Sequence, residues 1–363
     1  MIKVNYKNSL VSVSNSILNY YGVKTFHNTQ PLLDGYLKEK YNHIVVILID
    51  GMGINILNEH LSEDALLRKH YKTTISSVFP PTTVAATNAF LSAKMPYETG
   101  FLGWTQYNEL DDLIETVFLE EDSVTFEKTK IPLMRQLNYQ NFLTLVNKEN
   151  PNVEIEEIYT KPIKGSNLET FKQQLDRALM KTFSKKSLTY LYYPLLDSLI
   201  HEYGTKDEKI KNHLNEINDL YEQFTKEVGD DTLIITISDH GFTDIEFINL
   251  REYEEIVKTL KRDPSIEGRA MTFFVKKGYQ SQFKKLFNKY FKTDFKLIKT
   301  KKALRKNIFG FGRENYLLKT FLGDYLAIAT SNKAFNLSEN SKMAAHHGGS
   351  LKKELDVPLI INR

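Results

Sequence analysis

Aspartate and histidine residues recur in four short segments that lie far apart along this chain. The segments are Ile49-Asp50-Gly51-Met52-Gly53, Asp197-Ser198-Leu199-Ile200-His201, Ser238-Asp239-His240-Gly241 and His346-His347-Gly348-Gly349. Carboxylate oxygens and imidazole nitrogens are ligands for divalent cations such as Zn²⁺ and Mn²⁺. Two such cations about 4 Å apart stabilise both the attacking and the leaving oxygen of an in-line displacement. These residue types therefore indicate a two-metal site for phosphoryl transfer.

Each of the first two segments also has an ordinary structural explanation. Asp50 ends an apolar run before a glycine, which is typical of a turn as well as of a carboxylate ligand held by the strand behind it. Asp197 and His201 are four residues apart, so on a helix they project from one face. A surface ion pair satisfies the same spacing. Both segments follow strand-like runs, and this context favours the metal site.

The other two segments are rich in glycine. Asp239 and His240 can both reach one cation if the backbone turns sharply at Gly241, although a plain turn explains the tripeptide equally well. His346 and His347 stand before two glycines in a small-residue loop, where the backbone can approach a ligand closely. Adjacent histidines are not typical of a protein core, and only one of this pair is needed as a ligand.

A hydroxyl group for nucleophilic attack is offered between the first and second segments. Pro80 and Pro81 impose an extended approach, and residues 82–91 then read as a helix without charges. Capping by Thr82 or Thr83 is the ordinary explanation. A hydroxyl at a helix N-terminus that touches a cation is also favoured as an alkoxide by both the helix dipole and the metal. The segment is therefore a candidate for the nucleophile.

Continuous apolar runs predict the strands that position these residues. The runs are 44–49, 188–193, 232–237 and 325–329, and helical spacing predicts helices that include 9–21, 168–182 and 206–228. Strands that alternate with helices indicate an α/β fold with a mostly parallel sheet flanked by helices. In open sheets of this kind, ligands bind at the carboxyl ends of the strands. Asp50 and Asp239 stand at two such ends.

The pattern changes over residues 246–315, where mixed charge and aromatic residues predict a small α+β cap inserted into the core. Ten basic residues lie within 284–306, opposed by Asp294 alone. Interleaved with the aromatic residues of 287–295, they can follow the phosphates of a nucleic acid or another polyanion. The same spacing is typical of an amphipathic, solvated helix, which is the interpretation we prefer.

Composition restricts the class of protein. Of the 363 residues, 41% are hydrophobic, with 22 Phe and 20 Tyr, which is ample for a folded core. The net charge of +3 requires no polyanionic partner. The absence of cysteine excludes thiolate ligands and a cysteine nucleophile, and it fits a reducing compartment. Because we find neither a signal-peptide pattern nor a run with the length of a membrane helix, we expect a cytoplasmic protein without a membrane partner.

Taken together, the ordered motifs resemble the alkaline phosphatase superfamily, and within it the type I phosphodiesterase/nucleotide pyrophosphatase family. The resemblance extends from the helix before the first strand to Val357-Pro358-Leu359-Ile360, and it is weakest over 246–315. It implies an alkaline-phosphatase-like core. We expect that core to comprise residues 1–245 and 316–363, with residues 246–315 as the inserted cap.

The resemblance also implies a role for each motif residue. One metal would be held by Asp50, Asp239, His240 and the Thr83 oxygen, and the other by Asp197, His201 and His347. His347 is assigned rather than His346 because the family's ligand histidine directly precedes glycine. Thr83 is assigned rather than Thr82 because residues 92–100 resemble the family's TG…P…HG segment, and counting back from it reaches Thr83.

Two positions depart from the family pattern. Eukaryotic relatives carry an asparagine three residues after the nucleophile, where this chain has Ala86, so backbone N–H groups near Thr83 or the side chain of Asn88 would have to hold the phosphoryl oxygen. The family's HG is Thr99-Gly100 here. Trp104 or Tyr107 is a candidate for stacking a base or an aromatic leaving group, although packing of a loop onto the core explains both equally well.

The implied activity is hydrolysis of phosphodiester or pyrophosphate bonds in small, nucleotide-like substrates, with Thr83 forming a phospho-threonine intermediate. Two divalent metal ions would assist, Zn²⁺ in preference to Mn²⁺. A phosphomonoesterase, phosphonate hydrolase or phosphomutase of the same superfamily is the alternative, because these enzymes share the metal site. A nucleic-acid- or polyanion-binding protein that uses 284–306 is an alternative of another class. The sequence carries no signal for the oligomeric state.

Overall fold

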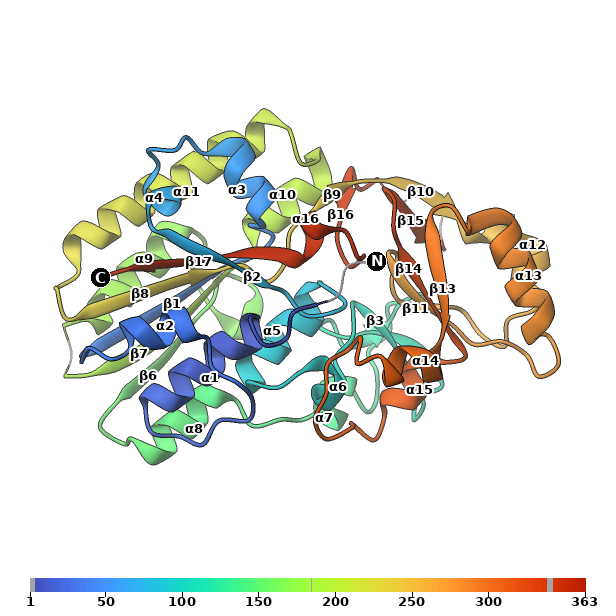
Figure 1. The fold of residues 1–363 in the computed structure, drawn as a ribbon, viewed down its shortest axis with the longest axis horizontal. Helices are drawn as coiled ribbons and strands as arrows, with labels where there is room; N and C mark the ends of the chain where they lie inside the picture. The colour runs from blue at the N-terminus through green and yellow to red at the C-terminus, as the bar shows by residue number, and fades with distance from the viewer. Residues whose placement is uncertain (1–3, 184, 338–341) are drawn as a thin grey trace.

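The computed structural model describes residues 4–183, 185–337 and 342–363, whose two largest β-sheets lie side by side (Figure 1). One sheet, here called the central sheet, has helices on both faces. The other, the second sheet, lies beside the amino-terminal end of helix α5 and carries its own helices. The chain passes between the two sheets several times, so neither is built from one continuous stretch of sequence.

The central sheet is mixed rather than mostly parallel. In spatial order its strands are β2 (Tyr71–Ser76), β17 (Asp356–Asn362), β8 (Thr232–Ile237), β1 (His43–Ile49), β7 (Ser187–Tyr193) and β6 (Glu154–Ile158). The pairs β8–β1, β1–β7 and β7–β6 are parallel, whereas β17 is antiparallel to both of its neighbours. The short helix α16 (Lys352–Leu355) lies at the carboxyl end of β8 and leads directly into β17. Because β17 starts at the edge of the sheet where β8 ends, the two strands run in opposite directions.

Three predicted strands are confirmed as β1, β7 and β8, and the predicted helices are confirmed as α1 (Leu10–Tyr20), α5 (Thr83–Ser92), α9 (Phe171–Lys181) and α11 (Glu208–Glu227). The run 325–329 is also a strand, β14 (Tyr325–Ala329), but it belongs to the second sheet. Strands β2 and β17 escape the pattern because β2 is a partly exposed edge strand and β17 contains Pro358.

Alternation along β1 explains why helices cover both faces of the central sheet. Ile44, Val46 and Leu48 pack against α1, α5 and α8 (Phe142–Glu149). Val45 and Ile47 face α3 (Ile54–His60), α9, α10 (Leu195–Tyr203) and α11. The two groups of helices lie on opposite sides of the sheet in Figure 1. Each of these fully buried side chains contributes about 1.5–3 kcal/mol, which makes β1 the centre of the core.

The second sheet is antiparallel. Its spatial order is β13 (Phe295–Lys299), β14, β12 (Ala270–Phe273), β11 (Ser265–Glu267), β3 (Thr105–Asn108), β4 (Leu113–Thr116) and β5 (Glu121–Asp122). These strands come from inside and outside residues 246–315, and an inserted cap made of that segment alone is not confirmed. The division of the chain into a core and a cap therefore stays a prediction.

Shorter elements complete the fold. The helices are α2 (Pro31–Tyr36), α4 (Leu66–Lys69), α6 (Pro96–Thr99), α7 (Leu133–Gln136), α12 (Glu254–Val257), α13 (Gln280–Phe291), α14 (Thr300–Arg305) and α15 (Leu318–Leu322). Two small ladders join β10 (Glu246–Asn249) with β15 (Lys333–Asn336), and β9 (Thr243–Asp244) with β16 (Ala345–His346). Among the described residues, no helix is both long enough and apolar enough to cross a membrane.

The basic stretch of α13 and β13 uses its aromatic residues for the core. Phe287, Phe291 and Phe295 are buried in a cluster with β12 and β14. They are therefore not free to stack nucleic-acid bases, which removes one support for the polyanion-binding alternative.

Candidate two-metal site

The carboxyl ends of three neighbouring strands bring the predicted ligands together. The register aligns Ile49 of β1 with Tyr193 of β7, and Leu48 with Ile237 of β8, so the three strands end at one edge. Asp50 follows β1 directly, Ser238 and Asp239 follow β8, and α10 begins two residues after β7. In α10, Asp197 lies in the first turn and His201 near the end, so both side chains lie at this edge.

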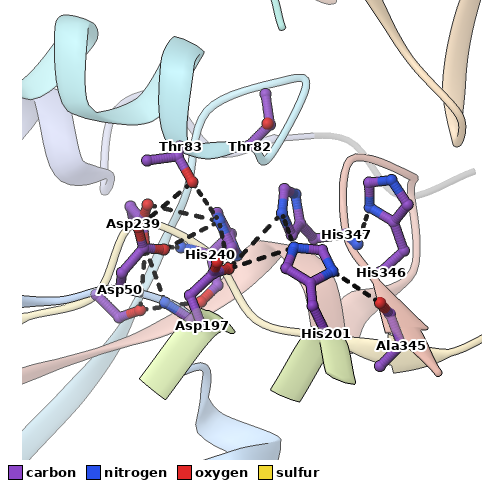
Figure 2. Close-up of polar contacts among 12 residues, drawn as sticks. Asp50, Thr82, Thr83, Asp197, His201, Asp239, His240, Ala345, His346 and His347 are labelled. Atoms are coloured by element: carbon purple, nitrogen blue, oxygen red, sulfur yellow. Dashed lines mark hydrogen bonds and ion pairs between the residues drawn. The ribbon is translucent and has the colours of Figure 1, made fainter. Parts of the chain in front are cut away.

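The first group of donors converges on the imidazole of His240. Its Nε2 lies 3.3 Å from Asp50 Oδ1, 3.5 Å from Asp239 Oδ2 and 3.2 Å from the Thr83 hydroxyl. Thr83 Oγ1 also lies 3.4 Å from Asp50 Oδ2. Asp50, Asp239 and His240 are all buried. Figure 2 shows the Thr83 hydroxyl directed at this group from above.

The second group lies beside the first. His201 Nε2 and His347 Nε2 are 3.2 Å apart, and Asp197 Oδ1 lies 3.6 Å from the former and 3.8 Å from the latter. His201 Nδ1 donates to Ala345 O at 2.9 Å, which leaves the lone pair of Nε2 for a ligand. The rings of His240 and His347 stack with their centroids 3.7 Å apart, so the two groups are in contact.

These distances fit coordination by divalent cations. A cation bound tetrahedrally at about 2.0–2.1 Å separates its ligand atoms by about 3.3–3.4 Å. The contacts given above span 3.2–3.5 Å in the first group and 3.2–3.8 Å in the second, which is close to this spacing. Asp50 Oδ1, Asp197 Oδ1 and Asp239 Oδ2 are buried atoms without a hydrogen-bond partner in the described protein. Buried carboxylate oxygens without partners are costly, and a bound cation would satisfy all three.

The pKa values of the aspartates and histidines in this site, in the absence of cations, also fit a metal site. Burial raises the pKa of Asp50, and the carboxylates of Asp239 and Asp197 raise it further. Burial lowers the pKa of His201 to about 4, and it also lowers the pKa of His240 and His347. Neutral imidazoles are the form that binds metal, and a cation would favour the ionised form of Asp50.

His346 also belongs to the neighbourhood, although the family resemblance does not assign it. A possible ligand atom of His346 lies within 4.8 Å of one on His201 and one on His347. However, its Nδ1 accepts a hydrogen bond of 2.8 Å from the backbone N–H of His347, and Figure 2 shows its ring at the outer side of the group. His346 thus orients the loop that carries His347.

Thr83 is the first residue of α5, and Thr82 is the N-cap. The Thr82 hydroxyl does not cap the helix; it donates instead to Glu267 Oε1 at 2.6 Å and points away from the aspartates (Figure 2). Within the described part of the chain, the backbone N–H groups of Thr83, Val84 and Ala85 have no acceptor. The helix start therefore presents a hydroxyl and several free donors on one side of the predicted metal ligands.

Close backbone packing holds the turns after β1 and β8 together. A Cβ atom on Gly53 would lie 2.4 Å from Gly241 Cα, and one on Gly241 would lie 2.1 Å from Lys353 O. Contacts this short exclude any side chain at either position. Gly241 is therefore required for close approach rather than for a positive φ, which is found instead at Gly51 and Gly348.

A buried ion pair holds two loops that carry predicted metal ligands. Arg269 Nε and Nη2 donate to Glu354 Oε1 and Oε2 at 2.7 and 2.8 Å. Glu354 also accepts from the backbone N–H groups of Gly349 and Leu351, and its carbonyl accepts from Gly241 N–H. Since Gly349 follows His347 closely and Gly241 follows His240, the pair fixes the backbone behind both histidines.

The predicted substrate residues lie in different surroundings. Asn88 is buried, donates to Val84 O and accepts from the Tyr139 hydroxyl, so both ends of its amide are already bound. Tyr107 is buried and donates to Asp112, and the guanidinium of Arg262 lies 3.4 Å from its ring centroid. The structure does not bring these two side chains into the metal site.

Trp104 differs because it is 42% exposed, with its ring in an edge-to-face contact with Phe118 at a centroid distance of 6.4 Å. Its backbone N–H donates to Glu267 Oε1 at 2.7 Å, which links it to Thr82 through one carboxylate. The proposed stacking of a base on Trp104 stays a prediction.

Sequence reasoning missed several residues of the site. Tyr192, the penultimate residue of β7, donates a hydrogen bond to Asp50. Glu267 and Arg269 come from the hairpin of β11 and β12. Tyr192 stands within an apolar run and reads as core. Glu267 and Arg269 lie in the segment where the sequence pattern is least regular, so no local signal connects them with Thr82 or Glu354.

Residues 44–348 match the family described as type I phosphodiesterase / nucleotide pyrophosphatase. This chain belongs to that family, which lies in the alkaline phosphatase superfamily, and it is therefore a hydrolase of a kind that depends on divalent metal ions. A comparison with curated proteins found no significant match.

Solved structures share the fold at low sequence identity. Murine ectonucleotide pyrophosphatase / phosphodiesterase 5 superposes with a TM-score of 0.65 at 12% identity, over 88% of this chain and 87% of that chain. An inactive threonine-to-alanine variant of the murine protein, in complex with AMP, gives 0.63 at 11% identity, again over 88% of this chain and 87% of that one. Phosphonoacetate hydrolase from Sinorhizobium meliloti, in complex with phosphonoformate, gives 0.60 at 13%, over 89% of this chain and 90% of that one.

Proposed function

We propose that this protein hydrolyses phosphodiester or pyrophosphate bonds of small, nucleotide-like substrates, with Thr83 as the nucleophile and two divalent metal ions, preferably Zn²⁺, as cofactors. One observation carries the proposal: the Thr83 hydroxyl lies 3.2 Å from His240 Nε2 and 3.4 Å from Asp50 Oδ2, at the start of a helix with free N–H groups. The AMP complex of the murine relative supports a nucleotide-like substrate.

Each residue of the site has its own role in this proposal. Asp50, Asp239 and His240 would hold one cation beside Thr83, and Asp197, His201 and His347 would hold the other. The cations would neutralise charge on the phosphoryl oxygens and lower the pKa of the nucleophile and of water. The N–H groups of Thr83, Val84 and Ala85 take the place of the family's asparagine, which is Ala86 here, as donors to a phosphoryl oxygen.

The reaction then proceeds as two displacements. Thr83 Oγ1 gives up its proton to solvent and forms a bond to phosphorus while the bond to the leaving oxygen breaks. The leaving oxygen departs with the bonding electron pair and takes up a proton from solvent. Water next attacks the phospho-threonine, the Thr83–phosphorus bond breaks, and the free hydroxyl is restored with release of the phosphoryl product. The ligands on the Asp197 side lie farther from Thr83 and would hold the leaving oxygen. The cytoplasmic location expected from composition remains part of this proposal.

The first test compares substrates and a nucleophile variant. The protein, loaded with Zn²⁺ or Mn²⁺, is assayed on bis-p-nitrophenyl phosphate, p-nitrophenyl phosphate and phosphonoacetate, beside Thr83→Ala. We expect a diester preference, and a loss in kcat of about a thousandfold or more in the variant. Thr87→Ala is the matched control, because Thr87 lies one turn further along α5 and its hydroxyl donates to Thr83 O. Turnover that survives in Thr83→Ala would refute the assigned nucleophile.

A further inference from the structure

Glu267, the last residue of β11, places a buried carboxylate beside the proposed phosphoryl site. Its side chain is enclosed, with 6% of the residue exposed. Oε1 accepts from the Thr82 hydroxyl at 2.6 Å and from Trp104 N–H at 2.7 Å. A Cβ atom on Gly348 would lie 3.2 Å from Glu267 Cβ. Glu267 thus lies between the residue before Thr83 and the residue after His347.

The carboxylate has no cationic partner. Among the described residues, no lysine, arginine or histidine pairs with Glu267, and Oε2 accepts no hydrogen bond from the protein. Burial raises the pKa of Glu267 to about 7, and the donors from Thr82 and Trp104 act against this. Divalent cations in the neighbouring site would favour the ionised form further. The negative charge is therefore available to act on whatever binds beside it.

The carboxylate of Glu267 would determine the net charge of the site when two divalent cations are bound. Two divalent cations carry four positive charges, which three aspartates and an ionised Thr83 oxygen already balance. Glu267 then makes the site negative before substrate binds. A phosphodiester brings one negative charge to this site and a phosphate monoester brings nearly two at neutral pH. In a site that contains little water, the effective dielectric constant is low, so each additional negative charge on the substrate increases its repulsion from Glu267.

We propose that Glu267 is a specificity-determining residue that selects substrates with a singly charged phosphoryl group, namely phosphodiesters with an uncharged leaving group, over dianionic monoesters and over leaving groups that carry further negative charge. This inference rests on the proposed function and narrows its substrate class. The free oxygen of the carboxylate is in addition an acceptor for a hydroxyl or ammonium group of the substrate.

Glu267→Gln isolates the charge. The amide oxygen of glutamine can still accept from Thr82 and Trp104, so the hydrogen bonds that hold the start of α5 are retained while the charge is lost. Glu115→Gln is the matched control. Glu115 of β4 is also a buried carboxylate, which accepts from Asn108 and from Leu133 N–H, and none of its hydrogen bonds involves the metal ligands.

The binding experiment uses the Zn²⁺-loaded protein and two anions, inorganic phosphate and diethyl phosphate, measured by calorimetry at about pH 8, where phosphate is mainly a dianion. We expect Glu267→Gln to bind phosphate about a hundredfold more tightly than the wild type does, because removing a unit charge about 12 Å away, at an effective dielectric constant of about 20, changes the affinity about tenfold for each charge on the anion. Affinity for diethyl phosphate should change much less. Equal changes for both anions, or the same change in Glu115→Gln, would overturn the inference.

The turnover experiment separates this inference from the proposed function. The ratio of kcat/KM for p-nitrophenyl phosphate to that for bis-p-nitrophenyl phosphate should rise about tenfold in Glu267→Gln. If both substrates are turned over but this ratio and the phosphate affinity stay unchanged, the inference is wrong and the proposed function stands. If neither substrate is turned over while phosphate binding tightens in the variant as expected, the proposed function fails and the role of Glu267 stands.

Discussion

Asp50 shows at the scale of one residue what a proposed metal ligand costs the protein in stability. It is 1% exposed, and it shares the site with the carboxylates of Asp239 and Asp197. Its surroundings raise its pKa, so in the folded protein without cations the ionisation of this carboxylate is unfavourable. Ligand residues of this kind are retained for function at a cost in stability.

Asp50→Asn should therefore stabilise the metal-free protein at neutral pH. The folded pKa lies above the unfolded value of about 3.9, so the folded wild type binds more protons and its stability falls as the pH rises through the folded pKa. An asparagine at position 50 does not ionise, so the variant does not lose this stability as the pH rises. We expect a higher unfolding midpoint for the variant, by about 2–4 °C per kcal/mol of relief, measured calorimetrically in EDTA at about pH 7.5.

The same advantage should shrink at about pH 5, because the wild-type carboxyl is then increasingly protonated. The histidines of lowered pKa, including His201 at about 4, destabilise both proteins as the pH falls from about 6.5, so they cancel in the difference. Asp64→Asn, at an exposed position, is the control. An advantage for Asp50→Asn that grows with acidity would contradict this account.

The two adjacent histidines should differ in metal binding. His347 Nε2 faces His201 and Asp197, whereas His346 Nδ1 accepts the backbone N–H of His347. We expect His347→Gln to lose about one metal equivalent per chain and His346→Gln to retain the wild-type content, as measured by mass spectrometry of the purified proteins. Loss of metal only in His346→Gln would reverse the assignment in favour of the neighbouring histidine.

At the scale of elements, the tip of the β11–β12 hairpin is the part of the second sheet that completes the site. Glu267 contacts the segment before Thr83, Gly268 O accepts from Phe335 N–H, and Arg269 pairs with Glu354. Three consecutive residues thus contact three separate stretches of chain. The hairpin holds together the segment before Thr83, the proposed nucleophile, with the loop after β8 and the loop that carries His347.

Arg269→Met should destabilise the protein strongly. Both members of the pair are fully buried, and removing the arginine leaves the charge of Glu354 without a counter-ion. The expected loss is about 3–5 kcal/mol in the free energy of unfolding, measured by urea denaturation. Lys258→Met, which breaks an exposed pair with Glu254, should cost no more than about 0.5 kcal/mol.

A second variant distinguishes the buried charge from lost packing. If the penalty arises from the uncompensated carboxylate, replacing Arg269 and Glu354 together by methionine should cost less than Arg269→Met alone. A double variant less stable than either single variant would show instead that the hydrogen bonds to Gly349 and Leu351 dominate.

At the scale of the whole molecule, metal binding should couple the two sheets. The proposed ligands belong to the central sheet and its loops, while Glu267 and Arg269 of the second sheet hold the same loops. Ordering the site should therefore stabilise both. A cation that binds only the folded state adds about 2.7 kcal/mol at a concentration one hundred times its dissociation constant.

Zn²⁺ should raise the unfolding midpoint equally by two probes. Far-UV circular dichroism follows the whole molecule, and fluorescence of Trp104, the single tryptophan, follows the start of β3 in the second sheet. We expect coincident transitions that shift together when metal is added and shift much less in Asp50→Asn. A shift seen by circular dichroism but not by fluorescence would show that the second sheet unfolds independently of the site.

The sequence by itself determined where the strands at the centre of the fold begin and end, and which side chains follow them. Continuous apolar runs identify β1, β7 and β8, and the residues after them, Asp50, Asp197 and Asp239, come to one edge because parallel strands in register end together. Ligand type and nucleophile type are likewise local properties of short motifs. These features could be predicted because each depends on neighbours within a few residues.

Only the tertiary structure decided the direction of β17 and the membership of β14 in a second sheet. It also decided which distant residues contact the motif residues. Thr82 meets Glu267 across 185 residues of sequence, and Arg269 meets Glu354 across 85. A buried carboxylate reads in the sequence as one more charged residue in an irregular segment. Its environment is set by packing between distant elements, and no local pattern of residues records that packing.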